Sequence, residues 1–133
     1  HNLALGAKYR AMEAEVRYET YRTDDDPDVL IVAYGTVARI ARTSIDNLRE
    51  KGLKVGLFRP VTLFPYPAAA LAAAAARAKH VLVAELSMGQ MVEDVRAVVA
   101  GRVPVDFFGR CGGMVMTAEE LAEQAEKLLA VPA

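Results

Sequence analysis

The side chains best suited to chemistry stand at the ends of short apolar runs. Glu85, Arg59 and the pair Gly35-Thr36 each follow such a run. A carboxylate can act as a general acid or pair with an arginine, and a guanidinium can bind a carboxylate through two parallel hydrogen bonds. Backbone N–H groups at a helix start, where Gly35-Thr36 is expected to lie, can hold an anion. These positions are the first candidates for a functional site.

Each candidate also has a purely structural interpretation. We favour a plain helix cap for Gly35-Thr36, because neither a G-x-G-x-x-G nor a glycine-lysine-threonine pattern surrounds it. We favour a salt bridge or an interface contact for Glu85, because structural ion-pair networks perturb carboxylates as active sites do. For Arg59 two partners stay open: a carboxylate of a substrate or neighbouring chain, or an acidic residue of this fold.

The remaining reactive residue types give no convincing site. Cys111 lies in the glycine-rich turn 109–113 beside Arg110, where no neighbouring base would hold it as a thiolate. His1 starts the chain, and His80 begins a predicted strand, away from the end where a site would lie. One cysteine and two distant histidines cannot close a zinc or iron–sulfur site. We predict no catalytic, cofactor-binding or metal-binding residue, and a reducing, cytoplasmic compartment.

Composition limits the class of protein. The 133 residues suit one domain, and 16 basic residues against 17 acidic ones lack the basic excess of nucleic-acid binders. No apolar run approaches the roughly 20 residues of a membrane span. We therefore predict a globular domain with no nucleic-acid or membrane partner. Because no signal sequence follows His1, we expect an internal or C-terminal piece of a longer polypeptide.

Five strands are predicted from the apolar patterning. The stretch 16–21 alternates as a half-exposed edge strand does, and an Asp-Asp-Asp-Pro turn ends it. Apolar runs typical of strands covered on both faces occupy 29–33 and 80–85, and 54–58 is predicted as the strand between them. The fifth strand, 103–108, contains Pro104, which cannot donate to a ladder and belongs at a sheet edge or strand start.

Helices are predicted between these strands. The first spans 37–51, with Thr36 as N-cap and Gly52 as its left-handed stop. The second is alanine-rich, with Pro67 at its first helical position and an end near Lys79.

Two further helices are predicted from capping boxes. The Ser87-x-x-Gln90 spacing precedes a helix at 91–100, and the Thr117-x-x-Glu120 spacing opens the final helix. Strands and helices therefore alternate along the chain. This alternation predicts an α/β fold with a largely parallel sheet and helices on both faces.

Four stretches together resemble a known family. They are Val32 to Thr36, the run from Gly52 to Pro65 with its arginine-proline-x-threonine-leucine-x-proline pattern, Glu85 with Gly89-Gln90-Met91, and Gly109-Arg110 with Gly112-Gly113. From about Val16 onward the chain resembles the transketolase-C-terminal-like domain of the α subunit of 2-oxoacid:ferredoxin oxidoreductases. Its opening, His1 to Tyr21, is similar to the branched-chain (2-oxoisovalerate) members, with 2-oxoglutarate as the rival substrate.

That resemblance implies a three-layer α/β/α domain over 16–133, preceded by a linker or docking segment at 1–15. It implies a five-stranded mixed sheet in the order 1-3-2-4-5, with strand 1 antiparallel. In that order the second and fourth strands are neighbours whose outgoing connections diverge, so their loops face one crevice. The candidate crevice or interface residues are Gly35, Thr36, Arg59, Glu85, Gly89, Gln90 and Arg110.

The resemblance also implies a role. The parent enzyme would oxidatively decarboxylate a 2-oxoacid to an acyl-CoA and reduce ferredoxin. Thiamine diphosphate, magnesium, an iron–sulfur cluster and coenzyme A would be held by other domains or subunits, against which this domain would pack, inactive alone.

Two alternatives stay open. One is an independent module that binds a small anion or coenzyme A at the helix starts. The other is the corresponding domain of a transketolase or a dehydrogenase E1 component, against which the stretch 59–65 and Gly89-Gln90-Met91 argue.

Overall fold

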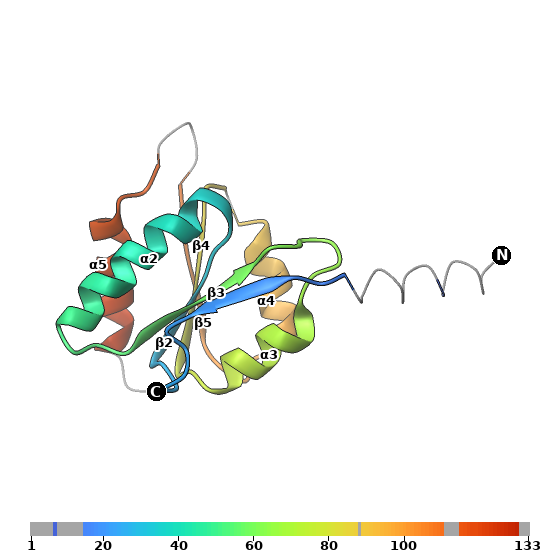
Figure 1. Cartoon of the computed structure of the whole chain (residues 1–133), viewed down its shortest axis with the longest axis horizontal. Helices are drawn as coiled ribbons and strands as arrows, with labels where there is room; N and C mark the ends of the chain where they lie inside the picture. Colours follow the sequence, from blue (N-terminus) through green and yellow to red (C-terminus); the bar gives the residue numbers. More distant parts are fainter. Residues whose placement is uncertain (1–6, 8–14, 88, 111–114, 131–133) are drawn as a thin grey trace.

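The computed structural model describes residues 7, 15–87, 89–110 and 115–130, which form a five-stranded sheet between two pairs of helices (Figure 1). The strand order is β1-β3-β2-β4-β5, with β1 antiparallel to β3 and every other pair parallel. The predicted fold class, strand order and antiparallel edge are confirmed. The predicted linker at 1–15 lies almost wholly outside the described residues and stays a prediction.

The elements are, in chain order, β1 (Tyr18–Tyr21), β2 (Val29–Val32), α2 (Gly35–Glu50), β3 (Val55–Pro60), α3 (Ala68–Ala76), β4 (His80–Glu85), α4 (Met91–Val99), β5 (Val105–Gly109) and α5 (Ala118–Leu129). No helix among these described residues is both long and apolar enough to span a membrane.

Two apolar cores lie on opposite faces of the sheet. Ile31 of β2 belongs to the core that includes Ile45 of α2 and Leu121 of α5. Its neighbour Leu30 belongs to the other core, with Leu71 of α3. Because successive strand side chains point to opposite faces, a strand that is covered on both sides is apolar at every position. This explains the continuous apolar runs in β2 and β4.

The capping rules hold at two helix ends. The Thr117 hydroxyl accepts the N–H of Glu120 at 3.1 Å, and the Glu120 carboxylate accepts the N–H of Thr117 at 3.3 Å, which confirms that capping box. After α2, Gly52 has φ of 83°, and the Leu53 N–H donates to the Leu48 carbonyl at 3.1 Å. This left-handed ending is the predicted glycine stop.

Two other predicted helix starts are wrong. Helix α2 begins at Gly35, with Tyr34 as a cap that has no side-chain bond, so Thr36 lies inside the first turn. Gly35 turns the chain directly into the helix at φ of 58°, which leaves no capping position for Thr36. Pro67 was predicted at the first helical position of α3, but it is the N-cap, and the helix begins one residue later, at Ala68. That helix also stops at Ala76, because the next N–H groups bond to carbonyls three residues back.

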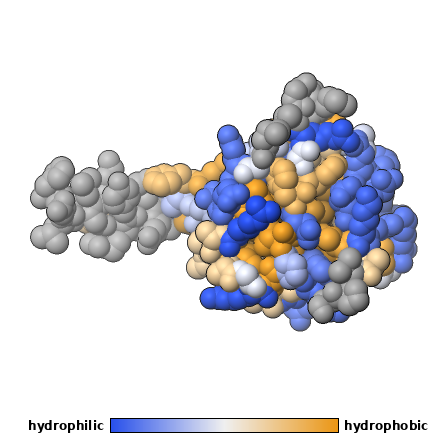
Figure 2. Space-filling model, turned by 180° about the vertical axis from the view of Figure 1, so that it is seen from behind, coloured by the Kyte–Doolittle hydropathy of each residue, from blue (hydrophilic) through white to orange (hydrophobic). Residues whose placement is uncertain are grey.

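The far edge of the sheet is β5. Pro104 stands just ahead of it, and its carbonyl accepts the Val81 N–H at 2.9 Å, which confirms the predicted place of the proline at the strand start. Figure 2 shows the molecule from the side opposite to Figure 1, with hydrophobic residues gathered in the middle and hydrophilic residues around them. The half-buried side chains of Phe107 and Phe108 belong to this edge.

Candidate functional site

The carboxyl ends of β2 and β4 are the predicted site. The two strands pair in parallel, with Val32 opposite Val83, while α2 and α4 leave them on opposite faces of the sheet (Figure 1). The arrangement is the one from which a crevice was expected. Gly35 and Thr36 are exposed at the start of α2, and Gly89 and Gln90 come just before α4. The entry of a ligand or a partner group between these loops stays a prediction.

Glu85 is fully buried at the end of β4. Its carboxylate accepts the backbone N–H groups of Met91 at 2.7 Å and Val92 at 3.0 Å, and the Ser87 hydroxyl lies 3.2 Å away. A negative charge at a helix N-terminus satisfies free N–H groups and interacts favourably with the helix dipole. Glu85 therefore caps α4 from the preceding strand, in place of the salt bridge or interface contact that we favoured.

The capping box predicted at Ser87 and Gln90 is wrong. The Ser87 hydroxyl accepts the N–H groups of Gly89 at 3.2 Å and Gln90 at 3.4 Å, which closes a turn before the helix. Helix α4 begins at Met91, and Gln90 gives it no side-chain cap. The Glu85 carboxylate occupies the helix start instead, because a charged oxygen is the stronger acceptor.

Close packing holds this corner together. Gly109 of β5 pairs with Glu85, and a Cβ at Gly109 would lie 2.6 Å from the Ser87 carbonyl oxygen. At Gly89, where φ is 110°, a Cβ would lie 3.2 Å from Val92. Only glycine fits both positions. Gly89 and Gly109 thus allow β5 to pack closely against the start of α4.

Both candidate arginines form ion pairs within the fold. Arg59 lies opposite Glu19 in the β1–β3 pair, and its Nη1 is 3.0 Å from the Glu19 carboxylate. Arg110 pairs with Glu120 of α5, while its backbone N–H donates to the Glu85 carbonyl at 3.1 Å. The structure thus joins Arg110 to Glu85 through the main chain and gives Arg59 the intramolecular partner that was one of its two alternatives.

Tyr66 belongs to this region but was missed from the sequence. Its hydroxyl is buried and has no hydrogen-bond partner among the described residues. Burial, and then the negative charges of Asp94 and Glu85, raise the pKa of the Tyr66 hydroxyl, so this group stays protonated. A tyrosine between two prolines reads as an ordinary loop residue, so no pattern in the sequence marked it.

The other reactive residues add no site. His1, Cys111, Gly112 and Gly113 lie outside the described residues, so their predicted roles are untested. His80 is buried at the start of β4, at the opposite end of the strand from Glu85. Within the described ranges, no three histidine, cysteine or acidic side chains come together as a metal site would require.

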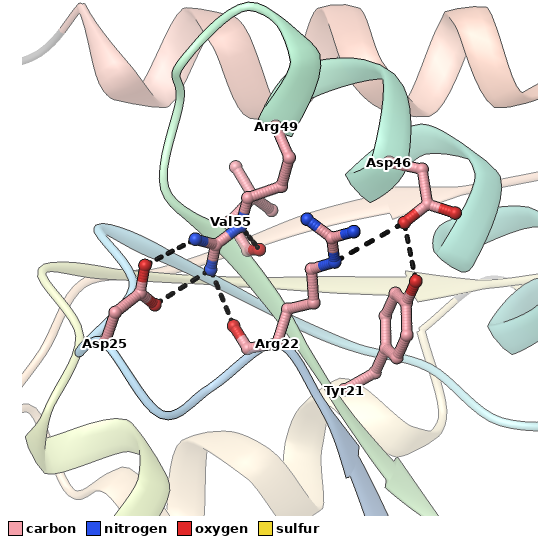
Figure 3. Close-up of polar contacts among 6 residues, drawn as sticks. All are labelled: Tyr21, Arg22, Asp25, Asp46, Arg49 and Val55. Atoms are coloured by element: carbon pink, nitrogen blue, oxygen red, sulfur yellow. Dashed lines mark hydrogen bonds and ion pairs between the residues drawn. The ribbon is translucent and has the colours of Figure 1, made fainter.

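At the amino end of the sheet, Arg49 organises a second polar cluster (Figure 3). Its guanidinium donates to the carbonyls of Arg22 at 2.7 Å and Val55 at 3.0 Å, and both of its terminal nitrogens donate to the Asp25 carboxylate. The hydrogen bond from Arg49 lowers the pKa of Asp25 to about 2. Arg49 thereby fastens the turn after β1 to the end of α2 and the start of β3.

The comparisons with known proteins agree with this architecture. Residues 27–121 match the family model described as "Pyruvate:ferredoxin oxidoreductase core domain II". The ketoisovalerate oxidoreductase subunit VorB of Methanothermobacter thermautotrophicus is 38% identical over 96% of this chain and 36% of its own. The 2-oxoglutarate synthase subunit KorA of Archaeoglobus fulgidus is 35% identical over 92% of this chain and 33% of its own. The chain thus spans about a third of the length of these relatives.

Two solved structures share the fold. A 2-oxoglutarate:ferredoxin oxidoreductase from Magnetococcus marinus, with 2-oxoglutarate, coenzyme A and succinyl-CoA bound, superposes with a TM-score of 0.77 at 27% identity over 85% of this chain and 20% of that one. A split-gene transketolase superposes with a TM-score of 0.69 at 21% identity over 85% of this chain and 41% of that one, a likeness of fold alone. The chain belongs to the pyruvate:ferredoxin oxidoreductase core domain II family.

Proposed function

We propose that this chain is an assembly domain, without catalytic residues of its own, in a cytoplasmic 2-oxoacid:ferredoxin oxidoreductase. The proposal depends mainly on the environment of Glu85. Its buried carboxylate accepts hydrogen bonds from the first N–H groups of α4. Arg59 and Arg110 are likewise engaged with Glu19 and Glu120. The groups best suited to chemistry are therefore used by the fold, and contact with the rest of the enzyme is the role that fits them.

The parent enzyme would convert a 2-oxoacid, coenzyme A and oxidised ferredoxin into an acyl-CoA, carbon dioxide and reduced ferredoxin. Thiamine diphosphate, magnesium and an iron–sulfur cluster would belong to other domains or subunits. We propose a branched-chain substrate such as 2-oxoisovalerate, supported by the 38% identity to a ketoisovalerate oxidoreductase subunit. The 35% identity to a 2-oxoglutarate synthase subunit makes 2-oxoglutarate the rival.

Turnover measurements test both parts of this proposal. The 133-residue chain, supplied with thiamine diphosphate, magnesium, coenzyme A and ferredoxin, should reduce no ferredoxin with either 2-oxoacid. The complete complex purified from the source organism should reduce it faster with 2-oxoisovalerate than with 2-oxoglutarate. Turnover by the chain alone would refute the assembly role, and a preference for 2-oxoglutarate would refute the substrate.

A second function is favoured by the start of α2. Its first turn has no side-chain cap and no acidic residue, and Gly35 has open space where a Cβ would stand. A small anion or a phosphate group of coenzyme A would fit such a turn. Calorimetry with pyrophosphate and with coenzyme A distinguishes the two functions, because tight binding to the isolated chain supports a binding module and its absence supports the assembly role.

A further inference from the structure

Exposed apolar side chains gather at one side of the molecule. Phe64 is 76% exposed, and Tyr18, Val61 and Leu63 are between 45% and 48% exposed. These four are among the six large hydrophobic residues that are exposed in the described part of the chain. They come from β1 and from the loop that follows β3, which projects beyond the sheet (Figure 1). Apolar surface gathered in this way marks a contact site in soluble proteins.

A groove adjoins these side chains, between β1 and α3. It is a hollow of about 490 Å³ lined by Val16, Tyr18, Tyr66, Pro67 and Ala68, Ala69 and Ala70, with no charged side chain. One neighbouring hollow shares Tyr18 and Ala70 with it, and another shares Val16 and reaches Val61. We call the hollow of about 490 Å³ the β1–α3 groove. The two neighbouring hollows are lined in part by charged side chains, Asp24 and Arg77 in one and Glu15 and Arg17 in the other. The groove stays open because the methyl side chains of α3 are too small to fill it.

The walls of the groove are held in place by the fold. The N–H groups of Val61 and Thr62 donate to the Arg17 carbonyl at 2.9 and 3.1 Å, and the Arg17 N–H donates to the Thr62 hydroxyl at 3.0 Å. The ring of Tyr18 stacks on that of Phe58, with centroids 5.2 Å apart. A preorganised surface loses little conformational entropy when a partner binds. These contacts hold Tyr18 and Val61 in fixed positions beside the groove.

The length of the relatives indicates what covers this surface. The chain spans 36% and 33% of the two relatives described above, and the matched family is a second core domain by its description. We propose that the β1–α3 groove binds an apolar segment of the same parent polypeptide, from the part that this chain does not span. This inference rests on the proposed function, and it specifies where the domain joins the rest of its subunit.

A matched pair of substitutions in the full-length subunit tests the groove. Ala69 lines the groove, whereas Ala76 is another exposed alanine of α3 and faces a small hollow on the α4 side. We expect Ala69→Glu to raise hydrogen-exchange rates of the backbone amides in 16–21 and 61–64 at least tenfold. Ala76→Glu should leave them at the wild-type rates. Phe64→Asp, in a loop where a charge cannot disturb the core, should act as Ala69→Glu does.

The same measurement contains the results that would overturn the proposal. Equal exchange rates in the wild type and all three variants would mean that nothing covers the groove. Protection that depends on subunit concentration would assign the groove to a second copy, and protection that appears only after another subunit is added would assign it to that subunit. Because exchange is read without substrate, a parent enzyme that lacks 2-oxoacid oxidation would defeat the proposed function and leave this result intact.

Discussion

The two ends of the sheet are completed in different ways. At the amino end, Arg49 binds Asp25, Arg77 binds Asp26 at 2.6 Å, and Lys79 lies 3.4 Å from Asp28, so the turn after β1 is fastened to the helices around it. At the carboxyl end, α2 starts without a side-chain cap, and the loop 61–67 leaves large apolar side chains in solvent.

This difference separates residues that complete the fold from residues that are left for a partner. Asp25, Asp26 and Asp28 of the amino-end turn find basic partners within the chain, although the turn itself is exposed. At the carboxyl end the charged group Glu85 is buried, while large apolar side chains such as Phe64 and Leu63 are exposed. A surface whose charged groups are paired within the chain is suited to face solvent. A surface with several exposed apolar side chains is suited to be covered by a partner. Variants at each end sharpen or break this contrast.

The largest effect is expected at the internal anchor of the carboxyl end. Glu85→Ala leaves the N–H groups of Met91 and Val92 buried without their acceptor, which should lower the free energy of unfolding by about 3 kcal/mol. Glu85→Gln keeps one acceptor oxygen and should cost about half as much. Urea denaturation of the three proteins measures both values. An Ala variant as stable as the wild type would show that the start of α4 does not depend on Glu85.

A smaller loss is expected at the amino end. The Arg49 side chain is only 15% exposed and donates to two main-chain carbonyls as well as to Asp25. Arg49→Met should lower the free energy of unfolding by about 2 kcal/mol, because those carbonyls lose charged donors. Arg39→Met, at an exposed position of the same helix, should change it by less than about 0.5 kcal/mol. Equal effects of the two variants would contradict the special role of Arg49.

The amino end should also respond to acid. The pKa of Asp25 is lowered to about 2 by Arg49, from an ordinary value of 3.8. Its contribution to stability is therefore fully present above about pH 5 and is lost as the pH falls through the interval between 3.8 and 2. The stability difference between the wild type and Asp25→Asn should shrink over that interval when thermal melting is followed against pH. A difference that stays constant down to pH 2 would contradict the ion pair.

The smallest effect on stability is expected where the surface is apolar. Phe64→Asp replaces a side chain that is 76% exposed, so the free energy of unfolding of the 133-residue chain should change by less than about 0.5 kcal/mol. Thermal melting and chemical denaturation measure this. A loss of more than about 1 kcal/mol would show that Phe64 belongs to the core of this domain and is not kept for a partner.

The fold could be predicted because its signals are local. The apolar runs of β2 and β4 lie between two helical layers, and Pro104 and the alternation in 16–21 mark the two edges. Capping was predictable where the partners lie within one turn, as for Thr117 and Glu120. It failed at α4, because the acceptor, Glu85, comes from a strand six residues before the N–H group of Met91.

The site and the surface depend on contacts between distant segments. Arg49 meets Asp25 and Val55 only after α2 has returned the chain to the amino end of the sheet. The β1–α3 groove needs Tyr18 beside Ala70, which are far apart along the chain. Neither arrangement can be recognised from a fixed spacing of residues in a single sequence. The strand order predicted that Gly35, Glu85 and Gly89 lie at the same end of the sheet, but the sequence did not show which groups each of them contacts.

Hydrogen exchange of the wild-type protein tests the contrast between the two ends most directly. It should be measured on the 133-residue chain alone and on the full-length subunit, and compared segment by segment. We predict that amides in 61–64 and 66 exchange at least tenfold more slowly in the subunit, while those in 22–26, held by Arg49, exchange at equal rates in both. Equal rates at 61–64, or new protection confined to 22–26, would contradict the conclusion that the apolar end is the one completed by the parent enzyme.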